Sequence, residues 1–136
     1  MNLQEIYDKT VRALHAQGGP SIRMGNHRHP VCAYRGQGGR KCAAGVHIPD
    51  EAYVPGMEML HMADIFRPLG FDHGQLLLLT ALRRAHDTST ANQHGTDYAT
   101  MPFKDTFPKS LRDVANHFHL SSRTVDECWP PVTVPA

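Results

Sequence analysis

Histidine and cysteine are the residues of this sequence that most readily carry chemistry, since imidazole and thiolate groups bind metal ions and move protons. The 136 residues include ten His and three Cys. One local group contains His27, His29, Cys32, Cys42 and His47. It offers enough nitrogen and sulfur donors for a tetrahedral zinc site, but not the two close ligand pairs of a zinc ribbon. We therefore expect two buried structural thiols and no cofactor, with zinc as the alternative.

A thiol nucleophile is a second hypothesis, because a reactive cysteine needs a histidine base and a group that orients this base. Its catalytic candidates are Cys32, Cys42, His86 and Asp87. His86 falls on the same helical stripe as Leu79 and Leu82, so we expect it to face the core. An inward histidine needs a partner. The sequence favours a buried hydrogen bond that locks its helix to the neighbouring chain over catalysis.

Composition limits the class of protein. The chain has 14 Lys and Arg against 13 Asp and Glu, a formal charge of +1, and 40% hydrophobic residues. This predicts a single globular domain over residues 1–131, with a flexible tail at 132–136. No run approaches the about 20 apolar residues that span a bilayer, and no secretory leader is visible. We therefore expect a cytoplasmic protein without membrane contact, in which a disulfide is disfavoured.

The predicted fold is α+β: a mainly helical domain with one small antiparallel β-hairpin. Helices are expected at 3–17, 49–53, 57–66, 73–87 and 111–118, with a final turn from 121 or 122 to 129. Short strands at 31–35 and 40–43 flank a glycine-rich turn and would place Cys32 opposite Cys42. Residues 88–100 are expected to form a surface loop. The predicted core is Leu3, Ile6, Tyr7, Leu14, Leu60, Phe66, Leu78, Leu79, Leu82, Leu111, Val114 and Phe118, and the methionines between 57 and 62 are expected to fill core gaps.

Three segments together resemble the pattern of a known protein family. They are Cys32-Ala33-Tyr34-Arg35-Gly36, Gly39-Arg40-Lys41-Cys42-Ala43-Ala44-Gly45 and Ile48-Pro49-Asp50-Glu51-Ala52-Tyr53. They resemble C-x-Y-R-G-x-x-G-x-x-C-A-x-G-x-x-I-P-D-E-x-Y of small uncharacterised proteins from phages, prophages and bacteria. The likeness continues at Glu58, at Arg84-Ala85-His86-Asp87 and at Val114-Ala115. It departs from the pattern at His47, where the family more often has an apolar residue, and at Met59, where a glycine is frequent. The resemblance implies a phage-linked accessory protein and supplies no mechanism.

The leading functional hypothesis is a non-catalytic accessory protein that binds a host or phage macromolecule, for example to inhibit a host system. A protein is the expected partner. The candidate binding residues are Tyr34, Arg35, Arg40, Lys41, Asp50, Glu51 and Tyr53. The basic residues that flank the glycine-rich turn could also contact a phosphate. The alternative from another class is a small enzyme that depends on Cys and His or on zinc.

A helix-turn-helix is the third hypothesis and would make a nucleic acid the partner. Residues 111–128 match the apolar pattern of a DNA-binding helix pair. However, His119 stands where a glycine is expected at the turn, and Arg123 is followed by Asp126 and Glu127. Because acids repel phosphates, ordinary helix packing is favoured.

Overall fold

The structure is a computed structural model that describes residues 1–25, 30–94 and 103–130. Within these ranges the α-helices are α1 (Leu3–Gln17), α2 (Met62–Phe66), α3 (His73–His94), α4 (Phe103–His117) and α5 (Arg123–Cys128). The strands are β1 (Ile22–Met24) and β2 (Pro30–Cys32), which form one antiparallel sheet. Short 3₁₀ helices are η2 (Gln37–Gly39), η3 (Gly45–His47), η4 (Asp50–Ala52) and η5 (Pro55–Met59). The predicted mainly helical α+β class is confirmed.

Helix α1 begins and ends where the sequence predicts. The Asn2 side chain accepts a hydrogen bond from the Glu5 amide at 2.8 Å, and the Glu5 carboxylate accepts one from the Asn2 amide at 3.0 Å. This reciprocal capping satisfies two amide groups that a helix start otherwise leaves unpaired. Gly18 ends the helix with a φ of +80°. The cap residues therefore fix the length of α1.

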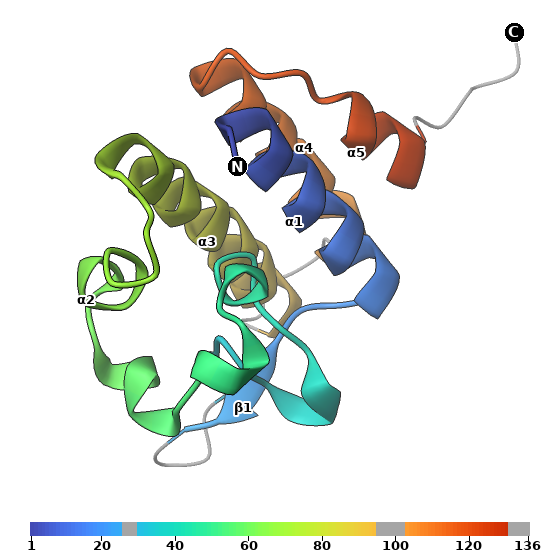
Figure 1. Ribbon diagram of the computed structural model, residues 1–136. Helices are drawn as coiled ribbons and strands as arrows, with labels where there is room; N and C mark the ends of the chain where they lie inside the picture. The colour runs from blue at the N-terminus through green and yellow to red at the C-terminus, as the bar shows by residue number, and fades with distance from the viewer. Residues whose placement is uncertain (26–29, 95–102, 131–136) are drawn as a thin grey trace, which may run out of the picture.

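The long helices form the core of the molecule. In Figure 1, α1, α3 and α4 lie in the upper part of the fold, and the chain from β1 to α2 folds across its lower end. Leu78, Leu79 and Leu82 of α3 are fully buried, as the leucine stripe predicts. The Tyr7 hydroxyl of α1 donates to the Leu111 carbonyl of α4 at 2.6 Å. α5 packs against α1. None of the described helices is long and apolar enough to cross a bilayer.

The strand pairing differs from the prediction. β2 pairs with β1, for which no strand is predicted, and Cys32 lies opposite Ile22 rather than Cys42. Residues 37–39 form the turn η2, in which Gly38 and Gly39 have φ values of +68° and +75°. Beyond this turn, the Lys41 amide donates to the Gln17 side chain at 2.9 Å. The predicted second strand is wrong because α1 holds that segment.

Three further expectations are corrected. α3 continues to His94, past the predicted end at Asp87, because Ser89 and Thr90 lie in the core rather than in a surface loop. The buried Thr90 hydroxyl donates to the His86 carbonyl at 2.8 Å. The helix expected from 111 begins at Phe103. Leu60 and Met59 are not core residues, since both side chains are exposed. The rest of the predicted loop, from 95, and the predicted tail lie outside the described residues.

Candidate functional site

Three of the four catalytic candidates meet in space. Cys32 at the end of β2 and His86 and Asp87 on α3 each offer one ligand-type atom, and these atoms lie within 4.8 Å of one another. Cys42 lines the same polar cavity of about 20 Å³ as Cys32 and Asp87. A cavity of this size holds about one water molecule. We call Cys32, His86 and Asp87 the polar cluster; the described residues leave a space of about one water molecule beside it.

His86 is the fully buried centre of this cluster. Its Nε2 accepts a hydrogen bond from the Ser21 amide at 3.0 Å, and its Nδ1 lies 2.9 Å from the Asp87 carboxylate. Because an amide can only donate, Nε2 carries no hydrogen and Nδ1 carries the one that Asp87 accepts. The rings of Phe103 and Phe107 contact the imidazole edge-on. The predicted inward histidine is confirmed: it fixes α3 to the start of β1.

The cysteine thiols are not activated. Burial, with a hydrogen bond to the Asp87 carboxylate and the charge of that group, raises the pKa of Cys32 to about 12. Burial likewise raises the pKa of Cys42 to about 12, although its Sγ accepts a bond from the Gly45 amide at 3.3 Å. A nucleophilic cysteine requires the opposite shift. The cluster therefore stabilises thiols rather than thiolates.

A metal ion does not fit this hydrogen-bond pattern, although Cys, His and Asp are all zinc ligands. A metal on Nδ1 of His86 would move the ring hydrogen to Nε2, where it would face the N–H of Ser21. A metal on Nε2 would instead leave the buried Ser21 amide without an acceptor. Hydrogen bonds thus occupy both ring nitrogens of His86.

Cys42 lies beside the polar cluster, whereas the three histidines among the zinc candidates lie apart from it or outside the described residues. His47 is buried, its Nε2 lies 2.7 Å from the Thr10 hydroxyl, and its ring packs edge-on against Phe71. Thr10 gives its own hydrogen to the Ile6 carbonyl, so Nε2 of His47 is the donor. Burial lowers the pKa of His47 to about 4. His27 and His29 lie outside the described residues. His47 thus occupies a core position.

Arg35, a predicted binding residue, points into the molecule. Its guanidinium donates to the carbonyls of Tyr34 at 3.1 Å, Gly45 at 2.8 Å and Ile48 at 2.6 Å. It also bonds the Asp50 carboxylate at 2.9 Å. The carbonyls belong to irregular backbone, which needs donors to replace those of a helix or sheet. Arg35 therefore holds the segments around it in place.

Two glycines of the same segment are required by close packing. A side chain at Gly36 would meet the Ser21 hydroxyl at 2.5 Å, and one at Gly45 would overlap the Tyr34 carbonyl. Any other residue would push the backbone segments apart. The pattern glycines thus serve the fold.

The remaining predicted binding residues divide into paired and exposed ones. Tyr34 is buried, and its hydroxyl accepts from Arg83 at 3.0 Å. Lys41 forms an ion pair with Asp50 at 3.1 Å, and the positive charges of Lys41 and Arg35 together lower the pKa of the Asp50 carboxyl. The ring of Tyr53 lies 5.0 Å below the Arg35 guanidinium. Arg40 and Glu51 are exposed. The structure thus brings most of this set together as internal contacts.

Comparison with protein-family models, curated proteins and solved structures finds no match. The resemblance to the phage-type family therefore stays a prediction.

Glu58, which the sequence offers only as part of the family resemblance, fixes a surface segment. Its carboxylate accepts from the amides of Tyr34 at 3.0 Å and Arg35 at 3.2 Å and from the Tyr53 hydroxyl at 2.6 Å. Nothing local in the sequence indicates this role, because the two amide donors lie 24 and 23 residues away along the chain. The consequence is a rigid attachment of η5.

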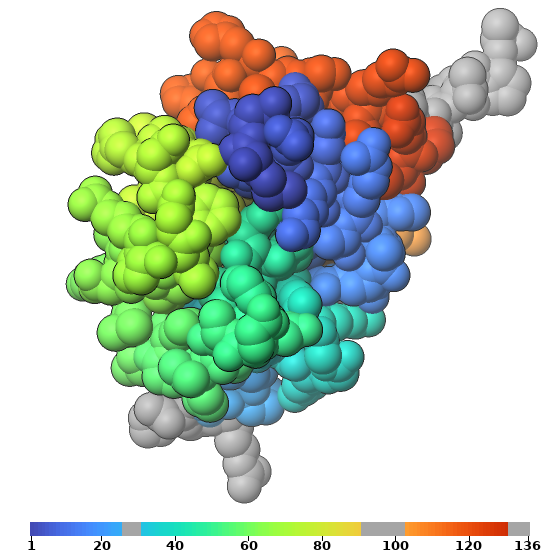
Figure 2. Space-filling view, in the orientation of Figure 1, coloured from blue at the N-terminus to red at the C-terminus, as the bar shows by residue number. Residues whose placement is uncertain are grey.

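The segment that Glu58 fixes exposes large apolar side chains. Val54 is 55% exposed, Met59 84% and Leu60 47%. Figure 2 shows this part of the chain (green) at the lower left surface of the molecule. We call residues 54–60 the exposed apolar segment. Its Val-Pro-Gly start could have signalled a surface loop rather than core.

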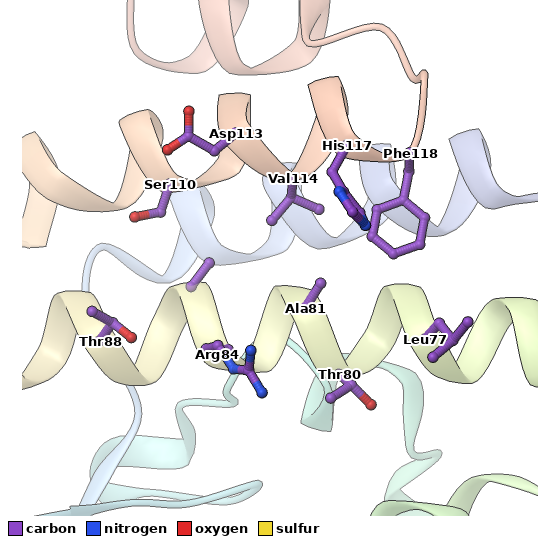
Figure 3. Close-up of a pocket in the computed structure, with 11 residues that line it drawn as sticks. Leu77, Thr80, Ala81, Arg84, Thr88, Ser110, Asp113, Val114, His117 and Phe118 are labelled. Atoms are coloured by element: carbon purple, nitrogen blue, oxygen red, sulfur yellow. The ribbon is translucent and has the colours of Figure 1, made fainter.

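A second surface feature is a groove of about 590 Å³ between α3 and α4 (Figure 3). Its lining residues are Leu77, Thr80, Ala81, Arg84, Ala85, Thr88, Ser110, Asp113, Val114, His117 and Phe118. They come from successive turns of the two helices, so the groove runs along the helix axes.

The predicted helix pair of a DNA-binding motif is present as α4 and α5. His119 adopts a φ of +56° at the turn, the conformation for which glycine is usual. However, Thr124 and Val125 of the short α5 are buried, and Arg123 bonds Glu127 at 3.1 Å. Arg112 is likewise paired, with Asp126 at 3.0 Å. The arginines that could meet phosphates are neutralised within the pair.

Proposed function

We propose that this chain is a non-catalytic accessory protein that binds a partner protein through the exposed apolar segment. The observation that carries the proposal is the exposure of Val54, Met59 and Leu60 on backbone that Glu58 holds in place. Neighbouring exposed apolar side chains mark interaction surfaces more often than isolated ones do. In keeping with the family resemblance, the partner is a host or phage protein of the cytoplasm.

The chemistry of the segment defines the partner surface. Methionine is flexible and polarisable, so Met59 adapts to an irregular apolar pocket. The hydrogen bonds of Glu58 order the backbone before binding, which lowers the entropic cost of association. Glu51, exposed just before the segment, has no charged partner among the described residues. The matching surface is a shallow apolar pocket with a basic residue at its rim.

The test uses an exposed methionine outside the segment as its control. Wild type, the double variant Met59→Ser, Leu60→Ser and the control Met24→Ser are immobilised, and proteins captured from a bacterial lysate are quantified. Met24 is 52% exposed, close to the 47% of Leu60, but lies on β1. We expect a partner that wild type and the control capture equally and that the double variant loses at least tenfold. Equal capture by the double variant, or no specific capture by wild type, would contradict the proposal.

A thiol-dependent or zinc-dependent enzyme is the second candidate, because Cys32, His86 and Asp87 meet. The raised pKa of Cys32 and the two occupied nitrogens of His86 weigh against it. Added Zn²⁺ is expected to leave the melting temperature unchanged. A Zn²⁺-dependent rise in the melting temperature that is absent in the variant Cys32→Ser would favour the zinc hypothesis instead.

A further inference from the structure

The groove between α3 and α4 carries one cation and one anion on opposite rims. Figure 3 shows Arg84 on the α3 side and Asp113 on the α4 side, at nearly the same level along the helices. Both are exposed, and neither forms an ion pair with another described residue. A ligand that fills this groove meets opposite charges on its two sides.

The two helices run in opposite directions along the groove. Thr88 lies across from Ser110 at one end, and Leu77 lies near Phe118 at the other (Figure 3). The groove therefore has a polar end and an apolar end. Its middle contains Ala81, whose small side chain lets another helix approach closely.

We propose that a second copy of this chain occupies the groove. A twofold axis that runs parallel to the helices, above the opening of the groove, packs α3 of one copy against α4 of the other. Because the rotation preserves position along the axis, residues at the same level along the helices face each other. Arg84 then faces Asp113 of the second copy, and the symmetry repeats this pair. Leu77 likewise faces Phe118 of the second copy at the apolar end. The result is a four-helix bundle of α3 and α4 from both copies.

Self-complementarity is the reason to choose a second copy over another occupant. A twofold interface requires each patch to match itself, and a rim of Arg84 opposite a rim of Asp113 meets this requirement. The contact is short, because α3 from Leu77 to Thr88 spans about 16 Å. We therefore expect a weak dimer that depends on concentration and salt.

Sedimentation velocity over a concentration series tests the inference by charge reversal. Each single variant, Arg84→Glu or Asp113→Arg, places like charges opposite one another at both symmetry-related contacts. We expect each to raise the dissociation constant of the dimer about tenfold or more. An equimolar mixture of the two variants restores opposite charges at both contacts, so it should dimerise like wild type. The double variant should do the same, because the swap preserves the complementarity.

Two controls complete the design. Lys109→Glu and Asp105→Arg reverse exposed charges of α4 that do not line the groove, and both should leave the dimer unchanged. Circular dichroism checks that every variant is folded. A chain that is monomeric at all concentrations, or a mixture that fails to recover, would overturn the inference. Neither result touches the proposed function, which the Met59→Ser, Leu60→Ser variant tests separately.

Discussion

The polar cluster and the exposed apolar segment reverse the usual placement of side chains. Cys32, His86 and Asp87 are the groups with the most chemistry, yet they lie inside or half inside, joined by hydrogen bonds. Met59 and Leu60 have no chemistry beyond apolar contact, yet they face solvent. Burying polar groups is tolerated when every donor and acceptor is satisfied. The difference teaches that reactive residue types here stabilise the fold, whereas unreactive ones are available to a partner.

Removing the centre of the polar cluster should have the largest effect. His86→Ala leaves the buried Ser21 amide without an acceptor and opens a cavity between the phenylalanine rings. We expect a loss of about 3–4 kcal/mol in the free energy of unfolding, measured by urea denaturation. His61→Ala, which removes an exposed imidazole, should cost under about 0.5 kcal/mol. Equal effects of the two substitutions would place His86 outside the stabilising network.

The next largest effect is a dependence of stability on pH. His47 titrates with a pKa of about 4 when folded, against 6.5 when unfolded, because burial disfavours its charged form. At pH values between these two pKa values, the unfolded chain binds more protons than the folded chain. The stability that neutral His47 contributes above pH 6.5 is therefore lost as the pH falls toward 4. The loss from this group is about 3 kcal/mol. Urea denaturation at several pH values measures this loss. In His47→Gln, the free energy of unfolding should depend less steeply on pH. An unchanged pH dependence would contradict the assignment to His47.

Two arginines of the predicted binding set should respond differently. Arg35→Lys loses the planar group that reaches three carbonyls, and we expect a cost of about 2 kcal/mol in unfolding free energy. Arg40→Lys, at an exposed position, should be within about 0.5 kcal/mol of wild type. Urea denaturation compares the pair. If both variants unfold like wild type, Arg35 is not the anchor that its contacts indicate.

The smallest effect is expected at the surface segment. Met59→Ser removes a side chain that is 84% exposed, so the free energy of unfolding should change by less than about 0.5 kcal/mol. Leu82→Ser, its buried counterpart, should cost several times more. A large loss in Met59→Ser under the same urea denaturation would mean that the segment belongs to the core.

The sequence predicts the parts of this fold that depend on local pattern. The cap residues Asn2 and Gly18 and the leucine stripe of α3 lead to the right helices, and the stripe also places His86 inward. Strand pairing fails because it depends on contacts distant in sequence, such as that between Gln17 and Lys41. For the same reason the sequence points to Cys32, His86 and Asp87 as candidates. It does not reveal that the Ser21 amide donates a hydrogen bond to Nε2 of His86.

The binding residues show a similar limit. A charged residue in a pattern can serve a partner or the fold, and only the geometry around Arg35 separates the two. Met59 illustrates the converse, since a lone methionine resembles core filler until its exposure is known. Exposure depends on how the whole chain packs, so local sequence does not determine it.

Alkylation of Cys32 tests most directly whether the polar cluster is structural rather than reactive. The rate is measured in folded Cys42→Ser, Cys128→Ser protein near neutral pH. With a pKa of about 12 in place of 9.0, the thiolate fraction is about a thousandfold lower than for an ordinary cysteine. We predict alkylation slower by about this factor, becoming ordinary when urea unfolds the chain. A folded protein that reacts as fast as free cysteine, or faster, would contradict the account.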